Sequence, residues 1–303
     1  MKKNILVVGD SIIDHDIFCE CVGTSLETPT LKAKFINEKS SFGGAANVVN
    51  NLLSLGARVT FFTGVGNDQY SGLFYNWKHR DLLFKPLKYE GQNLVKSRTW
   101  ITKGAHSYKY LQINRGDKIS PSETDIDTIK RHSLKQKFDT ALLIDYRNGI
   151  FDDENTSQEL IKHFKDNGTT VISSSQTSDR ESRHSHFINS NFICMNQEEA
   201  THNSLSFRPT LEHMKGLSKS FNSNICVTLG ARGSIMYYDG ALIHHDGYKV
   251  DAVDSCGAGD SFLAAFGINY DDKNLSYCNK WAAASTLKRG TTVPSCEKLN
   301  DIV

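Results

Sequence analysis

The sequence predicts an α/β fold in which helices cover both faces of a doubly wound, mostly parallel β-sheet. Short runs of apolar and β-branched residues alternate along the chain with stretches of helical periodicity. The strand-like runs are apolar throughout, as in strands that are buried on both faces. The length of 303 residues fits either two average domains or one large α/β domain, and we expect a single domain over residues 1–303.

The first half of the chain supplies three expected strands and one expected helix. Asn4–Val8 is predicted to be a buried strand, and Val59–Thr63 and Thr140–Ile144 are the next two. Gly44–Leu55 is predicted to be a helix, because apolar residues recur in it every three or four positions and Gly56 is a typical stop.

The second half continues the alternation and adds a hairpin at Asp239-Gly240, a strong turn signal. The expected elements are a helix at Asp153–Asp166, strands at Thr169–Ser173 and Asn191–Met195, a helix at Thr210–Ser220, strands at Ile225–Leu229, Gly233–Tyr238 and Ala241–Asp246, and helices at Ser261–Ile268 and Ser276–Lys288.

Two segments, 15–39 and 94–114, show a period of two residues and no helical pattern. We expect them to form a small separate β-sheet inserted in the domain as a lid. The exposed strand edges of such a sheet favour pairing between subunits, so we expect a homodimer through these segments.

The composition excludes several classes of protein. The net charge is 35 − 34 = +1, so nonspecific nucleic-acid binding is not expected. Charged residues at 23% and aromatic residues at 10% exclude a disordered chain. The mean hydropathy is −0.41, and no apolar run approaches the roughly 18 residues of a membrane span. The seven scattered cysteines and the short apolar run at the N-terminus favour a cytoplasmic protein without a signal peptide.

The sharpest chemical signal is Asp254–Phe262, which reads Asp-Ser-Cys-Gly-Ala-Gly-Asp-Ser-Phe. Gly257, Ala258 and Gly259, expected between a strand and a helix, bring backbone N–H groups together at a helix N-terminus, a place suited to phosphate. Asp260 adds a carboxylate there. Asp260 is alternatively a helix cap, but a cap does not require three small residues before it.

Three further features are candidates for a site outside the carboxyl ends of the strands, where open α/β sheets bind ligands. Gly43–Asn47 opens a helix and carries an amide one turn in, although it is alternatively an ordinary glycine-rich loop. Asp10 and Asp14 follow the first strand and suit sugar hydroxyls, which are good donors; the alternative is a solvated loop. Thr228–Gly233 is a glycine turn between strands, either a plain tight turn or part of a site.

Other phosphate-binding signatures do not occur in the sequence. There is no Gly-x4-Gly-Lys-Ser/Thr segment of a P-loop NTPase. The tripeptide His79-Arg80-Asp81 occurs, but no Asp-Phe-Gly segment accompanies it, and Pro86 stands where the protein-kinase catalytic loop has asparagine, so the protein-kinase signature is not met. The Gly-x-Gly-x-x-Gly dinucleotide fingerprint lacks its third glycine, which disfavours a nicotinamide enzyme.

Together these segments resemble the ribokinase-like, or PfkB-type, sugar kinase family over about residues 4–296. Asp254–Asp260 is similar to the family's Asp-Thr-x-Gly-Ala-Gly-Asp signature, and Gly43–Asn47 to its N-terminal signature. Asn196–Glu199 fits the Asn-x-x-Glu element tied to Mg²⁺ and phosphate placement, and Thr228–Gly233 looks like the nucleotide loop. Four elements in the family's order argue against chance. The resemblance implies a three-layer α/β/α fold with a β-sheet lid.

A closer likeness is to the kinase half of bifunctional heptose 7-phosphate kinases/adenylyltransferases. The segments that carry it are Val8–Asp14, Glu27–Pro29, Phe42–Val48 and Ser54–Ala57. It implies ATP-dependent phosphorylation of the anomeric hydroxyl of D-glycero-D-manno-heptose 7-phosphate to the 1,7-bisphosphate, for lipopolysaccharide or capsule precursors. No adenylyltransferase half is expected in a chain that stops at Val303. One departure is Ser173–Ser175, where that subgroup tends to have Asp-Pro-Lys.

The resemblance also implies residue roles. Asp260 accepts the proton of the attacking hydroxyl, and the N–H groups of Gly257, Ala258 and Gly259 stabilise the charge on the transferred group. Glu199 supports Mg²⁺ through water. The expected substrate-binding residues are Asp10, Asp14, Gly43, Gly44, Asn47, Lys96 and Arg98; the expected nucleotide-binding residues are Asn196, Thr228, Gly230 and Gly233; Asp254 with the loop Arg289–Ser295 is a candidate site for a monovalent cation such as K⁺.

Several alternatives stay open from the sequence. Lys96 and Arg98 are expected to hold a substrate phosphate, but they are alternatively solvated strand residues. The substrate is alternatively another sugar, sugar phosphate or nucleoside. A protein of another class, a non-catalytic binder of sugar or nucleotide, is favoured only by Ser173–Ser175 and disfavoured by the intact Gly257–Asp260 element.

Overall fold

The computed structural model describes residues 2–104, 106–177, 181–272 and 275–302, so residue 105 of the expected segment 94–114 lies outside it. The strands of the described residues are β1 (Asn4–Gly9), β2 (Ser11–Thr24), β3 (Leu31–Gly44), β4 (Arg58–Val65), β5 (Leu82–Lys88), β6 (Val95–Lys103), β7 (His106–Arg115), β8 (Thr140–Asp145), β9 (Thr170–Ser175), β10 (Phe192–Asn196), β11 (Asn224–Thr228), β12 (Ser234–Tyr238) and β13 (Ala241–His245). The α-helices are α1 (Ala45–Ser54), α2 (Ser71–Tyr75), α3 (Glu123–Ser133), α4 (Glu154–Asp166), α5 (Gln197–Asn203), α6 (Leu211–Phe221), α7 (Ala258–Asn269) and α8 (Leu275–Ser285), and the short 3-10 helices are η1 (His184–Phe187), η2 (Gly230–Arg232), η3 (Tyr270–Asp272) and η4 (Cys296–Asp301).

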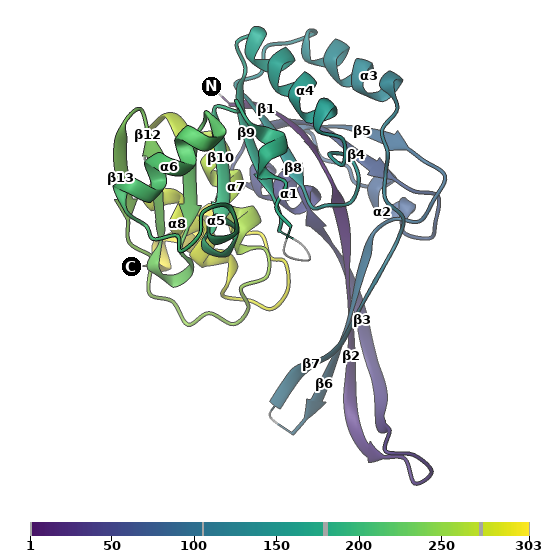
Figure 1. Ribbon diagram of the computed structural model, residues 1–303. Helices are drawn as coiled ribbons and strands as arrows, with labels where there is room; N and C mark the ends of the chain where they lie inside the picture. Colours follow the sequence, from purple (N-terminus) through teal and green to yellow (C-terminus); the bar gives the residue numbers. More distant parts are fainter. Residues whose placement is uncertain (1, 105, 178–180, 273–274, 303) are drawn as a thin grey trace.

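Among the described residues, nine strands form one large sheet in the order β13-β12-β11-β10-β9-β8-β1-β4-β5 (Figure 1). The strands from β11 to β5 run parallel, and β12 and β13 add an antiparallel hairpin at one edge. From β1 the chain builds the sheet outward through β4 and β5, and from β8 it builds in the other direction. The boundary between β1 and β8 is therefore the switch point at which such sheets place their ligands.

Helices cover both faces of the large sheet, because each central strand buries side chains on both sides. In β1, Ile5 and Val7 pack into a core with α1, α7 and α8. Leu6 and Val8 pack into a second core with α3, α4 and α6. The predicted doubly wound α/β fold is thus confirmed, and with it the continuous apolar strands that indicated it.

A second, smaller sheet of the described residues, in the order β3-β2-β6-β7, projects from the α/β body (Figure 1). It begins directly at the switch point, since Asp10 alone separates β1 from β2. Its inner face, which carries Asp14 and Asp16 of β2, also carries Trp100 of β6, whose Nε1 donates to Asp16 Oδ1 at 2.8 Å within the sheet. The guanidinium of Arg289, in the loop after α8, lies 5.0 Å from the centre of the Trp100 ring.

The expected elements are all present, with ends that differ by a few residues, but one strand and three α-helices of the described residues were not predicted from the sequence. The strand β5 is an edge strand with an irregular burial pattern. The helices α2 and α5 are short, with 5 and 7 residues. The helix α3 has 11 residues and buries only Ile126 and Ile129, so its apolar periodicity is weak. The capping box of Ser122 and Asp125 was its available signal.

The loop after β8 is held in place by the backbone of Ile119. Gly149 has a φ of +119°, and a Cβ there would lie 1.9 Å from the carbonyl oxygen of Ile119. The amide of Ile119 in turn donates to the carbonyl of Asn148 at 2.9 Å. This contact fixes residues 146–150 beside the switch point. No helix in the described ranges is long and apolar enough to cross a membrane.

We predict that Gly149→Ala destabilises the protein by about 3 kcal/mol or more, because the methyl group meets backbone and the left-handed φ is strained as well. Urea unfolding at fixed pH measures the free energy of unfolding. The matched control is Gly168→Ala, which has a φ of +73° and nothing within 4 Å of the added Cβ. It should lose only about 1 kcal/mol, and equal losses for both variants would contradict the account of this loop.

Candidate active site

Two neighbouring cavities open at the carboxyl end of the large sheet, beside the N-terminus of α7. The larger has a volume of about 970 Å³ and the smaller about 120 Å³, and both are lined by Asn196, Thr228, Gly259 and Phe262. The larger is of the size that accommodates a cofactor or nucleotide.

The start of α7 presents backbone N–H groups to these cavities. Gly257 is the N-cap residue with a φ of 81°, and a Cβ there would lie 2.8 Å from Nδ2 of Asn47. The first helical hydrogen bond runs from Ser261 N to Gly257 O at 3.0 Å, while the amide of Ala258 donates to Ser255 O at 3.2 Å. The amides of Gly257 and Gly259 therefore have no partner within the helix, and Ala258 and Gly259 line the larger cavity.

The turn lies between β13 and α7, as expected, but it does not follow the strand directly. The strand β13 ends at His245, and residues 246–257 form loop and turn among the described residues. Tyr248, Val250 and Ala252 of that segment line the larger cavity. This segment does not join the sheet and instead forms a wall of the cavity.

Asp260 lies in the first turn of α7, at the smaller cavity, and its side chain is buried. Its Oδ2 accepts a hydrogen bond from Asn47 Nδ2 at 2.8 Å, and its Oδ1 accepts one from the hydroxyl of Tyr146. Burial raises the pKa of Asp260 to about 6, against the lowering effect of these two donors. A carboxylate with that pKa is mostly ionised at neutral pH and still a competent proton acceptor.

Tyr146 was not among the site residues predicted from the sequence. This residue comes directly after β8, so the rule that ligands lie at strand ends was the signal that could have found it. Its amide donates to Oδ2 of Asp10 at 2.9 Å. Two more amides of the same loop, those of Asn148 and Ile150, also donate to the Asp10 carboxylate.

Asp10 was expected to bind sugar hydroxyls, but its carboxylate is fully buried under this loop. Burial, with Asp145 nearby, raises the pKa of Asp10 to about 7. In this arrangement Asp10 holds the loop that carries Tyr146, and its expected contact with sugar hydroxyls stays a prediction.

Asn47 is itself held by a buried chain of amides. Asn51, one turn further along α1, donates from Nδ2 to the carbonyl of Asn47 at 2.9 Å. Trp281 of α8 donates from Nε1 to Oδ1 of Asn51 at 2.8 Å. Both Asn51 and Trp281 are fully buried, and neither was singled out in the sequence. The chain fixes Asn47 against Asp260.

The small sheet brings Asp14 and two cations to the same place. Arg98 Nη2 lies 2.9 Å from Asp14 Oδ1 in a buried ion pair, and a Cβ on Gly43 would lie 2.7 Å from Asp14 Oδ2. Burial raises the pKa of Asp14, and Arg98 opposes that effect. Lys96 Nζ lies 5.9 Å from the centre of the Tyr146 ring. Arg98 is therefore already engaged by a carboxylate, whereas Lys96 faces the Tyr146 side of the site.

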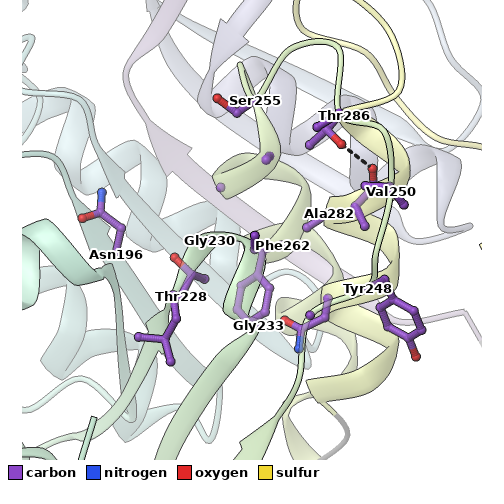
Figure 2. Close-up of a pocket in the computed structure, with 18 of the residues that line it drawn as sticks. Asn196, Thr228, Gly230, Gly233, Tyr248, Val250, Ser255, Phe262, Ala282 and Thr286 are labelled. Atoms are coloured by element: carbon purple, nitrogen blue, oxygen red, sulfur yellow. Dashed lines mark hydrogen bonds between the residues drawn. The ribbon is translucent and has the colours of Figure 1, made fainter. Parts of the chain in front are cut away.

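The expected nucleotide-binding residues gather on the larger cavity. Asn196, Thr228, Gly230 and Gly233 all line it (Figure 2). Figure 2 shows Asn196 and Thr228 across the pocket from Tyr248 and Ala282. The turn of Thr228–Gly233 contains the short helix η2, and the Leu229 amide closes it by donating to Gly233 O at 2.7 Å.

Glu199 lies at the smaller cavity and forms a capping box with Asn196 at the start of α5. Burial raises the pKa of Glu199 to about 7. Asp145 and Asp260 line the same cavity, and no Lys or Arg is among its described lining residues. This acidic lining fits a hydrated Mg²⁺ bound mainly through phosphates. No described cluster of three or more His, Cys, Asp or Glu is arranged to hold a metal by itself.

The carboxylate of Asp254 accepts hydrogen bonds from two loops. Its Oδ1 accepts from the amide of Cys256 at 3.0 Å, and its Oδ2 accepts from the amide of Gly290 at 2.9 Å. Its own amide donates to Thr286 O. The remaining oxygen lone pairs are of the kind that K⁺ accepts, so the monovalent-cation site at Asp254 stays a prediction.

Comparisons with known proteins agree with this arrangement. The model of the family described as pfkB family carbohydrate kinase matches residues 2–297. The bifunctional protein HldE of Campylobacter jejuni strain RM1221 is 30% identical over 312 residues, which cover 98% of this chain and 64% of that protein. HldE of Sulfurimonas denitrificans is 26% identical over 318 residues, covering 98% and 63%. The chain thus spans under two thirds of the length of these curated relatives.

Solved structures share the fold at lower identity. Phosphofructokinase-2 from Escherichia coli, in complex with potassium, superposes with a TM-score of 0.78 at 16% identity, covering 100% of this chain and 98% of that one. Ribokinase from Thermotoga maritima gives a TM-score of 0.73 at 20% identity, covering 98% of each chain. The expectation of a ribokinase-like fold is confirmed. Since the family model spans nearly all of the sequence, the chain belongs to the pfkB family of carbohydrate kinases, phosphotransferases that act on sugar hydroxyls.

Proposed function

We propose that this protein transfers the γ-phosphoryl group of ATP to the anomeric hydroxyl of D-glycero-D-manno-heptose 7-phosphate. The product is the 1,7-bisphosphate, a precursor of surface polysaccharide. The observation that carries the kinase chemistry is the buried carboxylate of Asp260 in the first turn of α7, at the smaller of two neighbouring cavities. The larger cavity is the proposed site of ATP.

The mechanism requires positioning and charge stabilisation more than covalent chemistry. Asp260 accepts the proton of the sugar hydroxyl as that oxygen attacks the γ-phosphorus. The amides of Gly257 and Gly259 donate to the oxygens of the transferred group, and the Ala258 amide joins them by leaving Ser255 O. Asn47 holds Asp260, and Asp14 accepts hydrogen bonds from sugar hydroxyls. The small sheet acts as a lid that excludes water.

We propose that two ions bind at the same site. Glu199 would hold Mg²⁺ through water, and the ion would supply positive charge next to the ATP phosphates. Asp254 is the proposed anchor for K⁺ behind the amides of Gly257–Gly259.

The choice of a heptose phosphate rests on the sequence resemblance and on the relatives named HldE. Binding of a sugar phosphate needs a positively charged side chain, and Lys96 is the better candidate because Arg98 pairs with Asp14. The alternative substrate is another sugar, sugar phosphate or nucleoside.

We also propose a cytoplasmic location, since no disulfide joins the seven cysteines, all of which the structure describes.

The segment Ser173–Ser175 bears on the non-catalytic alternative. Ser173 and Ser175 are buried and bond to Ser190 and Asp145 within the body, and Ser174 lines the smaller cavity. None of the three occupies the position of Asp260 or of the N-terminal amides of α7. The departure from Asp-Pro-Lys therefore alters one wall of the smaller cavity and leaves the proposed base in place.

The decisive experiment is a screen of sugar and sugar-phosphate acceptors with ATP and Mg²⁺, read as ADP release. We predict turnover on the heptose 7-phosphate, and a loss on the order of 10²–10⁴ in rate for Asp260→Asn, because the proton acceptor is gone. ATP should still raise the melting temperature of the variant. Asp166→Asn, an exposed carboxylate on α4, is the matched control.

Three outcomes would change the proposal. Turnover on an unphosphorylated sugar alone would replace the heptose phosphate by the alternative substrate class. Binding of ATP without ADP release on any acceptor would favour a non-catalytic binder. An Asp260→Asn variant as fast as the parent would remove Asp260 from the chemistry.

We further propose a homodimer through the outer face of the small sheet. Phe35, Tyr108, Leu111 and Ile113 lie on that face by the strand register and are about half exposed, between 45% and 57%. Such a cluster of exposed apolar residues marks an interaction surface. E. coli phosphofructokinase-2 has been solved in a tetrameric form.

We predict that the parent sediments at twice its chain mass of 33.9 kDa, and that Leu111→Glu with Ile113→Glu sediments as a monomer, because charges directly at an apolar interface prevent its burial. Leu205→Glu, at a residue that is 92% exposed outside the small sheet, is the control and should leave the mass unchanged. A parent that sediments at a single chain mass would refute the dimer.

A further inference from the structure

Both carboxylate oxygens of Asp260 are occupied, each by one donor. Asn47 donates to Oδ2 at 2.8 Å, and the Tyr146 hydroxyl donates to Oδ1. An ionised carboxylate only accepts hydrogen bonds, so both contacts favour the charged form of Asp260. In the proposed mechanism Asn47 holds Asp260, whereas Tyr146 has no assigned role.

The Tyr146 side chain is fixed from three directions. Its amide is bound by the buried carboxylate of Asp10 at 2.9 Å. Its ring passes close to Gly44, where a Cβ would lie 3.4 Å from the ring carbon Cδ2. Lys96 Nζ lies 5.9 Å from the ring centre, within reach of a cation–π interaction. Through its amide and its ring, Tyr146 thus links the β1–β2 junction, the start of α1 and the small sheet to Asp260.

We propose that Tyr146 is a positioning residue for the proton acceptor, holding Asp260 ionised and its carboxylate aimed at the attacking hydroxyl. This inference rests on the proposed function, which it deepens. It also gives Asp10 a part: Asp10 holds Tyr146, and Tyr146 holds Asp260.

One proton and one phosphoryl group are transferred in this step. The sugar O–H bond breaks and its proton goes to Asp260, while the sugar oxygen forms a bond to phosphorus and the bond from phosphorus to the ADP oxygen breaks. Tyr146 keeps its own proton throughout. Its pKa is raised well above the ordinary tyrosine value by burial and by Asp260, so it serves as a hydrogen-bond donor and not as the base.

Other titratable groups face Asp260 and Tyr146 and must be held constant in any test. Asp14 comes from β2, Lys96 from β6 and Glu199 from α5, and Cys256 lies in the turn before α7. Removing only the Tyr146 hydroxyl leaves all of them in place. Without this hydroxyl the ionised form of Asp260 loses a hydrogen-bond donor, so the pKa of Asp260 rises.

The test is the pH profile of kcat/KM for Tyr146→Phe on the acceptor found in the screen. The acid limb reports ionisation of Asp260, because the reaction needs the charged form. We expect this limb to move up by roughly one pH unit, with about a tenfold loss below it and a much smaller loss at high pH. KM for ATP should stay unchanged.

The matched control is Tyr270→Phe, which removes a partly buried phenol bonded to Thr170 Oγ1 at 2.9 Å, away from both cavities. Its profile should overlay that of the parent. A Tyr146→Phe variant that loses the same factor at every pH would show a merely structural role and overturn the inference.

A second readout does not depend on knowing the acceptor. In protein labelled with ¹³C at aspartate carboxyls, the Asp260 resonance is assigned from its absence in Asp260→Asn. Its titration midpoint should rise by roughly one unit in Tyr146→Phe and stay constant in Tyr270→Phe. An unchanged midpoint would refute the inference, whereas inactivity of the parent on every acceptor would refute the proposed function alone.

Discussion

The site depends on keeping one carboxylate out of water while leaving it ionised. Burial favours the neutral form of Asp260, and the donors Asn47 and Tyr146 oppose that effect. The N-terminus of α7 adds the positive end of a helix dipole at the same point. A group balanced in this way accepts a proton near neutral pH, which a solvated aspartate does poorly. The contacts that hold Asn47 and Tyr146 in place support this balance.

Those contacts explain why so many polar residues are buried here. Asn51 and Trp281 hold Asn47, and Asp10 holds the loop of Tyr146 through three amides. Buried polar groups are costly unless they are hydrogen-bonded, and in this network they bond to one another. A rigid set of donors follows, so that the geometry at Asp260 is present before a ligand binds.

The small sheet completes the site from outside the α/β body. Its inner face carries the ion pair of Asp14 and Arg98 and the Lys96 ammonium group over the Tyr146 ring, while its outer face carries exposed apolar side chains. One sheet thus has two chemically different faces, which suits a polar substrate on one side and a protein surface on the other. The contact between Arg289 and Trp100 joins its inner face to the loop that Asp254 anchors.

The sequence by itself determined the alternation of strands and helices, the family, and the cluster of small residues before Asp260, because these are local patterns or local motifs. It did not reveal α3 or β5, whose apolar patterns are weak, nor that residues 246–257 form a cavity wall. Tertiary structure alone decided what each polar residue touches: Asp10 binds the backbone of a loop 136 or more residues away, and Tyr146 meets Asp260 across 114 positions. Such partners are brought together by strand order at the switch point, and no local spacing in the chain encodes them.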